Sequence, residues 1–410
     1  MDQTDIAVMV RKLTAHWIVN VVNNNLTKLL QCFRAQCAAD TPKPCWVRGG
    51  DGLPNGINLH GYFLSETGLG ESARLLYRAL STQDVRIAAC NRVLEGRQND
   101  TSFSDIVSDN APYNAGITID GLTGFKRLRY QICKQKRNIA YPFWELDSIP
   151  AKYVDYLKKY DSIWVPSHFI RDTIKRYGFT NVELVKHPID LPAEEPQFFD
   201  PTGTLKILFH FDFDSFPARK NPEAAIFAFK QAFPNREDVS LTVKTRGKRD
   251  LGRRQWLAEQ TADDPRITVI DRLLDRNAIN AMMAEHDVFL SLHRSEGLGL
   301  ACAEALTAGK AVVATDYGGS TEFINAQTGF PVEWSRIDVG PKDYVLAENA
   351  TWAEPSIDHA AKLLRSIYEN PHEARERAKN GFRHLVEKHS FAAVGRDMVN
   401  ILHKKGLLAA

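Results

Sequence analysis

Two glutamates in the latter half of the chain, Glu296 and Glu304, have a spacing that suits recognition of a charged, hydroxylated ligand. A buried strand is predicted over residues 288–292, and after a glycine-containing turn a helix is predicted over residues 300–308. Glu296 would lie in the turn and Glu304 inside the helix, so both can face one pocket at the carboxyl end of the strand. Carboxylates accept hydrogen bonds from sugar hydroxyls, and the free amides at a helix start attract phosphate. These features predict a nucleotide-sugar site, whereas two spaced glutamates alone would also fit an ordinary surface helix.

A second glycine-containing turn follows the strand predicted over residues 311–315. It contains Gly318 and Gly319, where backbone amides can approach phosphate oxygens because no Cβ stands in the way. This turn favours the functional interpretation of the two glutamates over the surface-helix interpretation.

The segment 296–323 resembles the retaining GT-B glycosyltransferases of family 4, in which a Glu-x7-Glu motif is followed by a strand and a Gly-Gly turn. The resemblance continues at residues 217–222 and 352–355, and it covers roughly residues 57–390 at the level of pattern. It implies transfer of a sugar from a nucleotide-diphosphate sugar to a hydroxyl acceptor, with retention of configuration.

The resemblance also implies roles for individual residues. Glu296 would hold the donor sugar, Glu304 the nucleotide ribose, and Lys220 would be one of two cations that neutralise the diphosphate. Developing charge on the diphosphate would be stabilised by these cations and by the amides at the helix start. The rest of the predicted donor-binding set comprises Arg219, Lys244, His293, Gly297, Leu298, Gly299, Gly318 and Gly319.

The second cation does not stand where the family places it. Asp214 occupies the position of the family's arginine, so Arg219 or Lys244 is expected to supply the missing charge. Lys244 is favoured, because a lysine at the end of a buried strand is costly without a partner, although its side chain can also extend to solvent. The triplet Asp212-Phe213-Asp214 is similar to a DxD metal motif, but the motif is short and common and the GT-B fold uses cationic side chains instead. No metal and no cofactor are expected.

In the first half, the motif Gly68-x-Gly70-x-x-Ala73 follows a strand predicted over residues 57–63 and opens a predicted helix. This is the fingerprint of a dinucleotide-binding loop, so an NAD(P)-dependent oxidoreductase is the alternative function. NAD requires an acidic residue at the end of the second strand, where the sequence is Cys-Asn-Arg, although Arg92 leaves NADP open. The glycosyltransferase resemblance instead assigns Gly68 and Gly70 to a loop that faces the donor diphosphate.

Glu145 follows a strand predicted over residues 138–143, within a Trp-Glu segment similar to one in a subset of these enzymes. An acid at a strand end can position acceptor hydroxyls, with Trp144 stacking on a sugar face; the alternative is a packed aromatic cluster with a solvated acid. The predicted catalytic residues are therefore Glu296, Lys220 and Glu145. No strong general base is evident, which agrees with the front-side substitution proposed for the family, in which the diphosphate oxygen takes the acceptor proton.

Strands and helices must alternate to position these residues, and the hydrophobic pattern predicts that they do. Such alternation is typical of parallel sheets covered by helices, so we expect an α/β protein of the GT-B type, with two Rossmann-like, doubly wound domains facing across a cleft. The predicted divisions are an N-terminal helical extension (1–45), an acceptor domain (46–200) onto which residues 389–410 pack back, and a donor domain (201–388). The Pro-rich stretch 191–203 is the predicted linker and hinge.

The composition is that of a globular protein, with 410 residues, 44% hydrophobic and 25% charged. It excludes a mainly disordered, collagen-like or coiled-coil chain. The net charge of +2 argues against wholesale binding of nucleic acid. The six cysteines contain no CxxC pair, so neither a zinc site nor a disulfide framework is expected.

The N-terminus is acidic where a signal peptide is basic, and no apolar run approaches the about 20 residues that span a membrane. We therefore expect a cytoplasmic protein. Residues 6–39 contain no acid and have apolar residues at near-helical spacing. This basic amphipathic pattern fits contact with the inner face of a membrane or with a partner, or packing on the protein's own domain. The resemblance alone suggests bacterial surface-glycan or protein glycosylation, with a carbohydrate, lipid-linked or protein acceptor; a non-catalytic nucleotide-sugar-binding module is a third interpretation.

Overall fold

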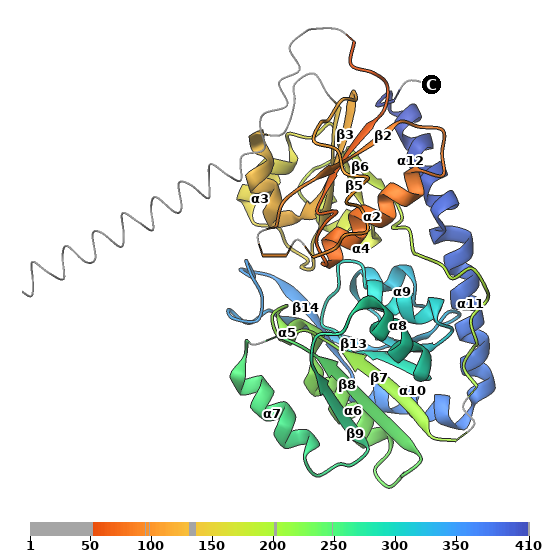
Figure 1. The fold of residues 1–410 in the computed structure, drawn as a ribbon. Coiled ribbons are helices and arrows are strands. Elements are labelled where there is room, and N and C mark those ends of the chain that lie inside the picture. Colours follow the sequence, from red (N-terminus) through yellow and green to blue (C-terminus); the bar gives the residue numbers. More distant parts are fainter. Residues whose placement is uncertain are drawn as a thin grey trace, which may run out of the picture. The chain divides into compact units, whose positions relative to one another are not determined.

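The computed structural model describes residues 52–94, 96–97, 99–130, 137–200, 203–247 and 249–408. The predicted N-terminal extension, with its basic amphipathic segment 6–39, lies outside these residues. The described part contains two six-stranded sheets whose paired strands are all parallel (Figure 1). Within the described ranges, no helix has the length and apolar character needed to cross a membrane.

The first sheet has the strand order β2-β1-β3-β4-β5-β6. Its strands are largely buried on both faces, because helices cover them, and their residues are accordingly apolar and often β-branched. The strands are β1 (Ile57–Gly61), β2 (Ile87–Asn91), β3 (Ala115–Gly121), β4 (Arg137–Phe143), β5 (Ser162–Val165) and β6 (Val182–Leu184).

Four helices from the first half of the chain and one from its C-terminal end accompany this sheet. The last helix, α12, packs against α2, with Val394 and Met398 in the same core cluster as Leu76 and Leu80 (Figure 1). The helices are α2 (Gly68–Leu80), the 3₁₀ helix η1 (Leu122–Tyr130), α3 (Ala151–Leu157), α4 (His168–Lys175) and α12 (Phe391–Lys404).

The second sheet has the strand order β12-β11-β10-β7-β8-β9. Its centre is the pair β10 and β7, flanked by β11, so the loops after these strands emerge at the same edge. The strands are β7 (Leu205–His210), β8 (Val239–Thr245), β9 (Ile267–Asp271), β10 (Val288–Ser291), β11 (Ala311–Thr315) and β12 (Phe330–Val332).

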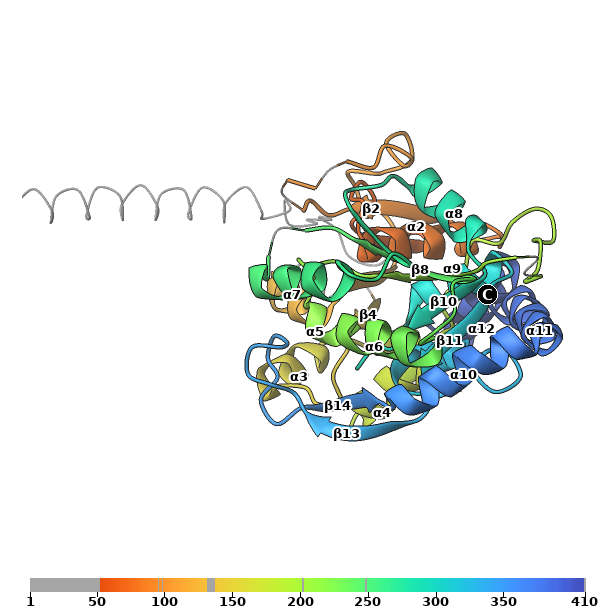
Figure 2. The same cartoon turned by 90° about the horizontal axis from the view of Figure 1, so that it is seen from below.

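Helices also surround the second sheet (Figure 2). The long helix α11 leads directly into α12, so the chain leaves the second half and returns to the first at Ser390. The helices are α5 (Pro217–Lys220), α6 (Pro222–Ala232), α7 (Leu251–Thr261), α8 (Arg276–Glu285), α9 (Leu300–Thr307), the 3₁₀ helix η2 (Gly318–Glu322), α10 (Ile357–Glu369) and α11 (Pro371–His389).

An antiparallel hairpin that the sequence pattern did not predict follows β12. It consists of β13 (Trp334–Asp338) and β14 (Thr351–Pro355). Tyr344 and Leu346, in the connection between these strands, pack into a core cluster that contains residues of both halves, including Trp144. The hairpin therefore ties the second half of the molecule to the loops at the end of β4.

The stretch 191–203 has no helix or strand in its described residues, 191–200 and 203. It is nevertheless anchored, because Phe199 is buried in the second core and its amide donates a 3.0 Å hydrogen bond to the carbonyl oxygen of Gly309. The chain passes between the two halves twice, at residues 191–203 and at Ser390, and the residues just before these two crossings are in contact. The amide of Ile189 donates a hydrogen bond to the carbonyl oxygen of His389 at 2.8 Å. A hinge at 191–203 and the predicted division at residues 200/201 stay predictions.

Candidate functional site

The centre of the candidate site is Glu296, in the loop between β10 and α9. Its side chain is only 12% exposed, and Oε2 accepts a 2.8 Å ion-pair contact from Arg219, while Oε1 accepts a hydrogen bond from Lys220. Burial alone would raise the pKa of Glu296, but the charges of Arg219 and Lys220 outweigh that effect and hold the pKa well below its usual range. Glu296 is therefore an ionised carboxylate held by two cations.

The local sequence explains why both cations reach this carboxylate. Arg219 and Lys220 close the one-turn helix α5, which lies between two residues in the left-handed region, Phe216 (φ 53°) and Asn221 (φ 54°). Asn221 tolerates this conformation and also caps α6, because its side-chain oxygen accepts from the amide of Ala224 at 3.3 Å. The resulting double turn presents adjacent basic side chains to one acid.

Arg294 holds the loop of Glu296 against neighbouring segments, a role that the sequence analysis missed. Its Nε donates to Glu354 at 2.5 Å, and Nη1 donates to the carbonyl oxygen of Ala218 at 2.8 Å. The amide of Ala353 in turn donates to the carbonyl oxygen of Arg294 at 3.0 Å. The family-like segments 217–222 and 352–355 therefore meet at the Glu296 loop.

Glu304, inside α9, has a different basic partner from that of Glu296. Its Oε1 accepts a 2.6 Å contact from Arg276, whose other nitrogen lies 3.0 Å from Glu71 at the start of α2. Burial and the negative charge of Glu296 raise the pKa of the Cys302 thiol to about 12, and Glu304 adds to this effect, so Cys302 is close to both acids. That both glutamates contact one ligand stays a prediction.

His293 is the histidine of the predicted donor-binding set, and it is fully buried. Its Nδ1 is hydrogen-bonded to Ser291 at 3.0 Å, and Nε2 to Ser320 at 3.0 Å and to the carbonyl oxygen of Tyr317 at 3.2 Å. Burial lowers the pKa of His293 to about 4, so the ring is neutral near pH 7. His293 connects the end of β10 to the Gly-Gly turn, while a direct donor contact stays a prediction.

The glycines around Glu296 pack against one another, which differs from the expectation that the Gly-Gly turn is open to phosphate. The amide of Gly319 donates a 2.6 Å hydrogen bond to the carbonyl oxygen of Glu296, and a Cβ on Gly319 would lie 2.1 Å from the carbonyl oxygen of Gly297. A Cβ on Gly318 (φ +82°) would lie 2.6 Å from the carbonyl oxygen of Glu296. These glycines permit two loops to touch, so the Gly319 amide is already used within the protein.

The start of α9 offers amides instead. Gly299 is its N-terminal cap residue (φ +81°), and no described side chain caps this helix. Leu298 is 3% exposed and packs in the core, so only its backbone can face a ligand. Uncapped first-turn amides can bind a phosphate group, and a phosphate contact at the start of α9 stays a prediction.

Lys244, the favoured second cation, is the penultimate residue of β8, and it is buried. Its Nζ donates to the carbonyl oxygen of Thr245 at 3.3 Å, and burial lowers the pKa of Lys244. Asp212 accepts a 2.7 Å hydrogen bond from Arg246. The geometry favours Arg219 over Lys244 as the partner of Lys220, because Arg219 shares the carboxylate of Glu296 with it.

The aspartates of the DxD-like triplet accept hydrogen bonds within the loop after β7 and from the loop after β8. Asp212 Oδ1 accepts a 2.8 Å hydrogen bond from the amide of Asp214, and Asp214 Oδ1 accepts one of 3.2 Å from the amide of Arg249. Among the residues that the structure describes, no group of three or more His, Cys, Asp or Glu side chains is placed to hold a metal ion.

The glycine motif of the first half opens α2, as its position after β1 predicts. The side chain of Thr67 caps this helix, accepting from the amide of Gly70 at 3.1 Å, and a Cβ on Gly70 would lie 2.1 Å from the carbonyl oxygen of Ser65. Gly68 differs, since a Cβ there would meet no described atom within 4 Å. Arg92, which left NADP open, instead forms an ion pair with Asp120.

Glu145 lies in the loop after β4 and is contacted from the second half. The hydroxyl of Tyr344 donates to its carboxylate at 2.5 Å, and Ser295 donates to its carbonyl oxygen. Trp144 is 3% exposed, donates its indole N–H to Ser148 at 2.7 Å, and packs edge-on against Tyr344. Trp144 is therefore a packed residue, which favours the alternative of an aromatic cluster over stacking on a sugar face.

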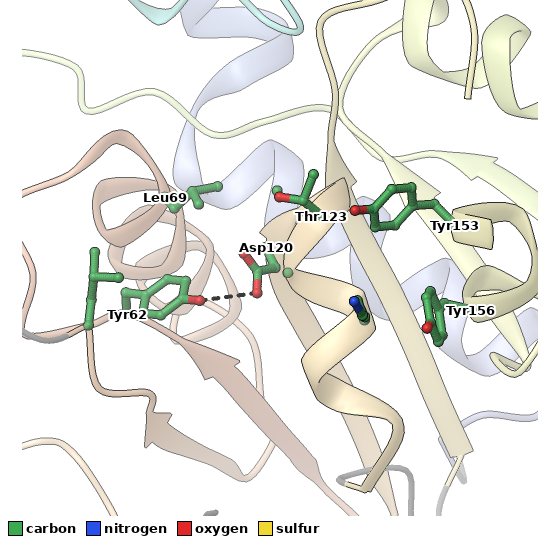
Figure 3. A pocket seen from close by; sticks show the side chains of 10 residues that line it. Tyr62, Leu69, Asp120, Thr123, Tyr153 and Tyr156 are labelled. Atoms are coloured by element: carbon green, nitrogen blue, oxygen red, sulfur yellow. Dashed lines mark hydrogen bonds between the residues drawn. The ribbon is translucent and has the colours of Figure 1, made fainter. Parts of the chain in front are cut away.

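A pocket that the sequence analysis did not predict opens among residues of the first half, between positions 62 and 156 (Figure 3). It has a volume of about 680 Å³ and lies where β1 and β3 end. Its lining comprises Tyr62, Leu69, Leu94, Asp120, Gly121, Thr123, Gly124, Lys126, Tyr153 and Tyr156.

Comparisons with known proteins agree with this arrangement. Residues 206–338, which span most of the second sheet and the loops around Glu296, match the family model described as "Glycosyl transferases group 1". No curated protein sequence matches the chain.

Several solved structures share the fold. A glycosyltransferase from Rickettsia africae ESF-5 has a TM-score of 0.59 and 14% identity, over 86% of this chain and 98% of that one. Anabaena Alr3699/HepE in complex with UDP-glucose has a TM-score of 0.58 and 12% identity, over 86% of this chain and 100% of that one. A mutant of S. aureus TarM in complex with Fondaparinux, alpha-GlcNAc-glycerol and UDP has a TM-score of 0.55 and 14% identity, over 70% of this chain. This chain spans only 55% of TarM.

At these identities the likeness shows the fold. The two parallel six-stranded sheets with their helices are those of the GT-B fold, as the sequence analysis predicted.

Proposed function

We propose that this protein is a glycosyltransferase that moves a sugar from a nucleotide-diphosphate sugar to a hydroxyl acceptor. The observation that carries the proposal is the buried carboxylate of Glu296, held by Arg219 and Lys220 beside the uncapped start of α9. An acid for sugar hydroxyls, two cations and helix-start amides together suit a sugar diphosphate. The match of residues 206–338 to a glycosyltransferase family model supports the same conclusion.

In this proposal the catalytic residues are Glu296, Lys220 and Glu145. Lys220, Arg219 and the amides of α9 stabilise the charge that develops on the leaving diphosphate, with Gly68 and Gly70 facing it from α2. A phosphate oxygen of the leaving group takes the proton of the acceptor hydroxyl on the same face of the sugar, so configuration is retained and no strong protein base is needed. Glu145 positions the acceptor hydroxyl, and neither a metal nor a cofactor takes part.

The setting proposed is the cytoplasm, at the inner face of a membrane, in bacterial surface-glycan or protein glycosylation, and family 4 is the proposed classification. UDP-sugars are the first donors to examine, because the Anabaena structure holds UDP-glucose and the TarM mutant holds UDP. The similarity to these two structures supports only the choice of UDP-sugars as the first donors to examine.

A nucleotide panel and a transfer assay test the proposal. Thermal unfolding is followed with UDP, GDP, ADP, CMP and dTDP, since a ligand that binds only the folded state raises the unfolding temperature. Transfer or hydrolysis of the matching sugar nucleotide is then measured for Glu296→Gln, Lys220→Ala and the control Glu333→Gln, whose side chain is 80% exposed. We expect the first two variants to lose about 100-fold in kcat and the control to be unaffected.

The same experiment separates the alternatives. If Glu296→Gln and Lys220→Ala both transfer sugar within a few-fold of the wild-type rate, the site assignment is wrong. Nucleotide binding with neither transfer nor hydrolysis indicates a non-catalytic module, and NADPH binding without any nucleoside diphosphate binding indicates an oxidoreductase.

A further inference from the structure

The pocket at the carboxyl ends of β1 and β3 combines a buried acid with three tyrosines, one from the loop after β1 and two from α3. Figure 3 shows Tyr62 and Leu69 on one side of Asp120 and Tyr153 and Tyr156 on the other. Its volume of about 680 Å³ falls within the range of small-ligand sites. No residue of this pocket belongs to the proposed donor site.

Asp120 has the bonding of a ligand-holding acid. It is 4% exposed, and one carboxylate oxygen, Oδ2, accepts from both the Tyr62 hydroxyl at 3.1 Å and Arg92. Arg92 also lies over the ring of Tyr62, 4.6 Å from its centroid. These contacts fix the carboxylate, and no described residue hydrogen-bonds to its second oxygen, Oδ1. A fixed carboxyl group with one unused oxygen on a pocket wall is suited to accept a hydrogen bond from a hydroxyl.

The tyrosines supply the complementary part of such a site. Tyr153 and Tyr156 project from adjacent turns of α3, with ring centroids 6.2 Å apart and planes tilted by 57°. An aromatic face packs well against the C–H groups of a pyranose ring, while each phenol can exchange hydrogen bonds with hydroxyls. Thr123 and the exposed Lys126 add further polar groups along the rim. Ring faces beside hydroxyl partners are the chemistry that recognises a carbohydrate rather than an acyl chain.

The pocket also adjoins the proposed donor site. Leu69 lines the pocket, and two residues later Glu71 contacts Arg276 at 3.0 Å, which in turn contacts Glu304 at 2.6 Å. The start of α2 thus separates the pocket from the acid proposed to bind the donor ribose. A ligand in this pocket would lie across the start of α2 from Glu304.

We propose that this pocket binds the acceptor as a pyranose carbohydrate, with a ring against Tyr153 and Tyr156 and a hydroxyl on Oδ1 of Asp120. This inference rests on the proposed function and narrows the acceptor to a sugar, excluding an acceptor recognised through a bare amino-acid side chain.

Saturation-transfer NMR with the full chain tests the proposal without any donor. The probes are methyl α- and β-pyranosides of glucose, galactose, mannose and N-acetylglucosamine, together with maltose and lactose. We expect at least one probe to receive saturation from the protein, and we expect about tenfold weaker binding in Tyr156→Ala and in Asp120→Asn. Tyr368→Phe changes a tyrosine outside the pocket and is the control, with binding expected to equal that of wild type. Unfolding temperatures show whether a variant has lost its fold. If Asp120→Asn is unfolded, Tyr156→Ala alone tests the proposal.

Two outcomes overturn the proposal: no probe binds the wild-type chain, or the bound probe binds Tyr156→Ala as tightly as wild type. UDP and GDP binding, measured on the same samples, keeps this result separate from the proposed function. Nucleotide binding without sugar binding refutes the acceptor pocket alone. Sugar binding without binding of any nucleoside diphosphate refutes the proposed donor chemistry and leaves a carbohydrate-binding pocket.

Discussion

The hydroxyl of Tyr344 donates a 2.5 Å hydrogen bond to Oε2 of Glu145, joining the β13–β14 connection to the end of β4. Burial, followed by the negative charge of Glu145, raises the pKa of Tyr344 well above its usual value, so the hydroxyl stays protonated and keeps donating. Burial alone would lower the pKa of Arg219, but the negative charges of Glu296 and Glu145 outweigh this effect and raise it. The orientation of Glu145 therefore depends on a residue that belongs to no recognised motif.

Tyr344→Phe removes this donor while keeping the ring that packs against Phe216 and Trp144. If Glu145 positions the acceptor, we expect kcat for transfer to fall about tenfold, because a hydrogen bond to a charged group is lost, with KM for the sugar nucleotide unchanged. Steady-state kinetics measure both constants. The control is Tyr368→Phe, which removes a hydroxyl that donates to Asp238 at 2.6 Å.

A double-mutant cycle sharpens this test. Because both side chains act through one hydrogen bond, Tyr344→Phe combined with Glu145→Gln should lose little more activity than Glu145→Gln alone. Losses that simply multiply would show that Tyr344 and Glu145 act independently.

Arg276 links Glu71 of α2 to Glu304 of α9, and its removal should weaken nucleotide binding. Arg276→Ala leaves Glu304 without the cation that orients its carboxylate, so we expect the Kd of the matching nucleoside diphosphate to rise about three- to tenfold. Titration calorimetry gives the Kd. Arg375→Ala, which breaks a more exposed ion pair with Asp200, is the control. An unchanged Kd in Arg276→Ala would separate Glu304 from nucleotide recognition.

The strands were predictable because they are buried on both faces and read as continuous apolar runs. Strand β11 has the predicted bounds, Ala311–Thr315. The hairpin β13–β14 was missed because one of its strands, β13, is largely exposed and so lacks an apolar period. Local patterns thus predicted the sheets that position the site.

Contacts between residues far apart in the sequence were not predictable in the same way. Nothing near Tyr344 or Asp120 in the sequence marks them, since their roles arise from partners on other elements. Arg276 did carry a weak signal, because an arginine at the first residue of a helix opposes the helix dipole and needs an acidic partner. Lys244 shows a similar problem: its position near the end of a buried strand was predicted, but the contact of its side chain with the carbonyl oxygen of Thr245 was not.

Two glycines that sequence analysis treats alike should respond differently to alanine. In Gly319→Ala the Cβ would collide with the carbonyl oxygen of Gly297, so we expect a loss of about 3 kcal/mol in the free energy of unfolding. In Gly68→Ala the Cβ would enter open space, so the unfolding temperature should not change. If Gly68 faces the diphosphate, the KM for the sugar nucleotide rises in that variant. Equal unfolding temperatures for both variants would contradict the packing described for Gly319.

The buried His389, at the contact between the two chain crossings, should make the free energy of unfolding depend on pH. His389 is fully buried, its Nδ1 is bonded to the carbonyl oxygen of His187 at 2.8 Å, and burial lowers the pKa of His389 to about 4. The unfolded chain binds a proton at this position below about pH 6.5, but the folded chain does so only near pH 4. Stability is therefore complete above pH 6.5 and declines between pH 6.5 and pH 4, by about 2 kcal/mol at pH 5 for this histidine.

Urea unfolding at pH 7 and pH 5 measures this contribution. We expect His389→Asn to be less stable than wild type at pH 7, because a buried group is replaced, yet to lose about 2 kcal/mol less than wild type between the two pH values. His403→Asn changes an exposed histidine of α12 and should keep the wild-type pH dependence. An identical pH dependence in wild type and His389→Asn would mean that His389 is not a buried neutral group, and that the contact between the two crossings is looser than the 2.8 Å bond of Ile189 to His389 indicates.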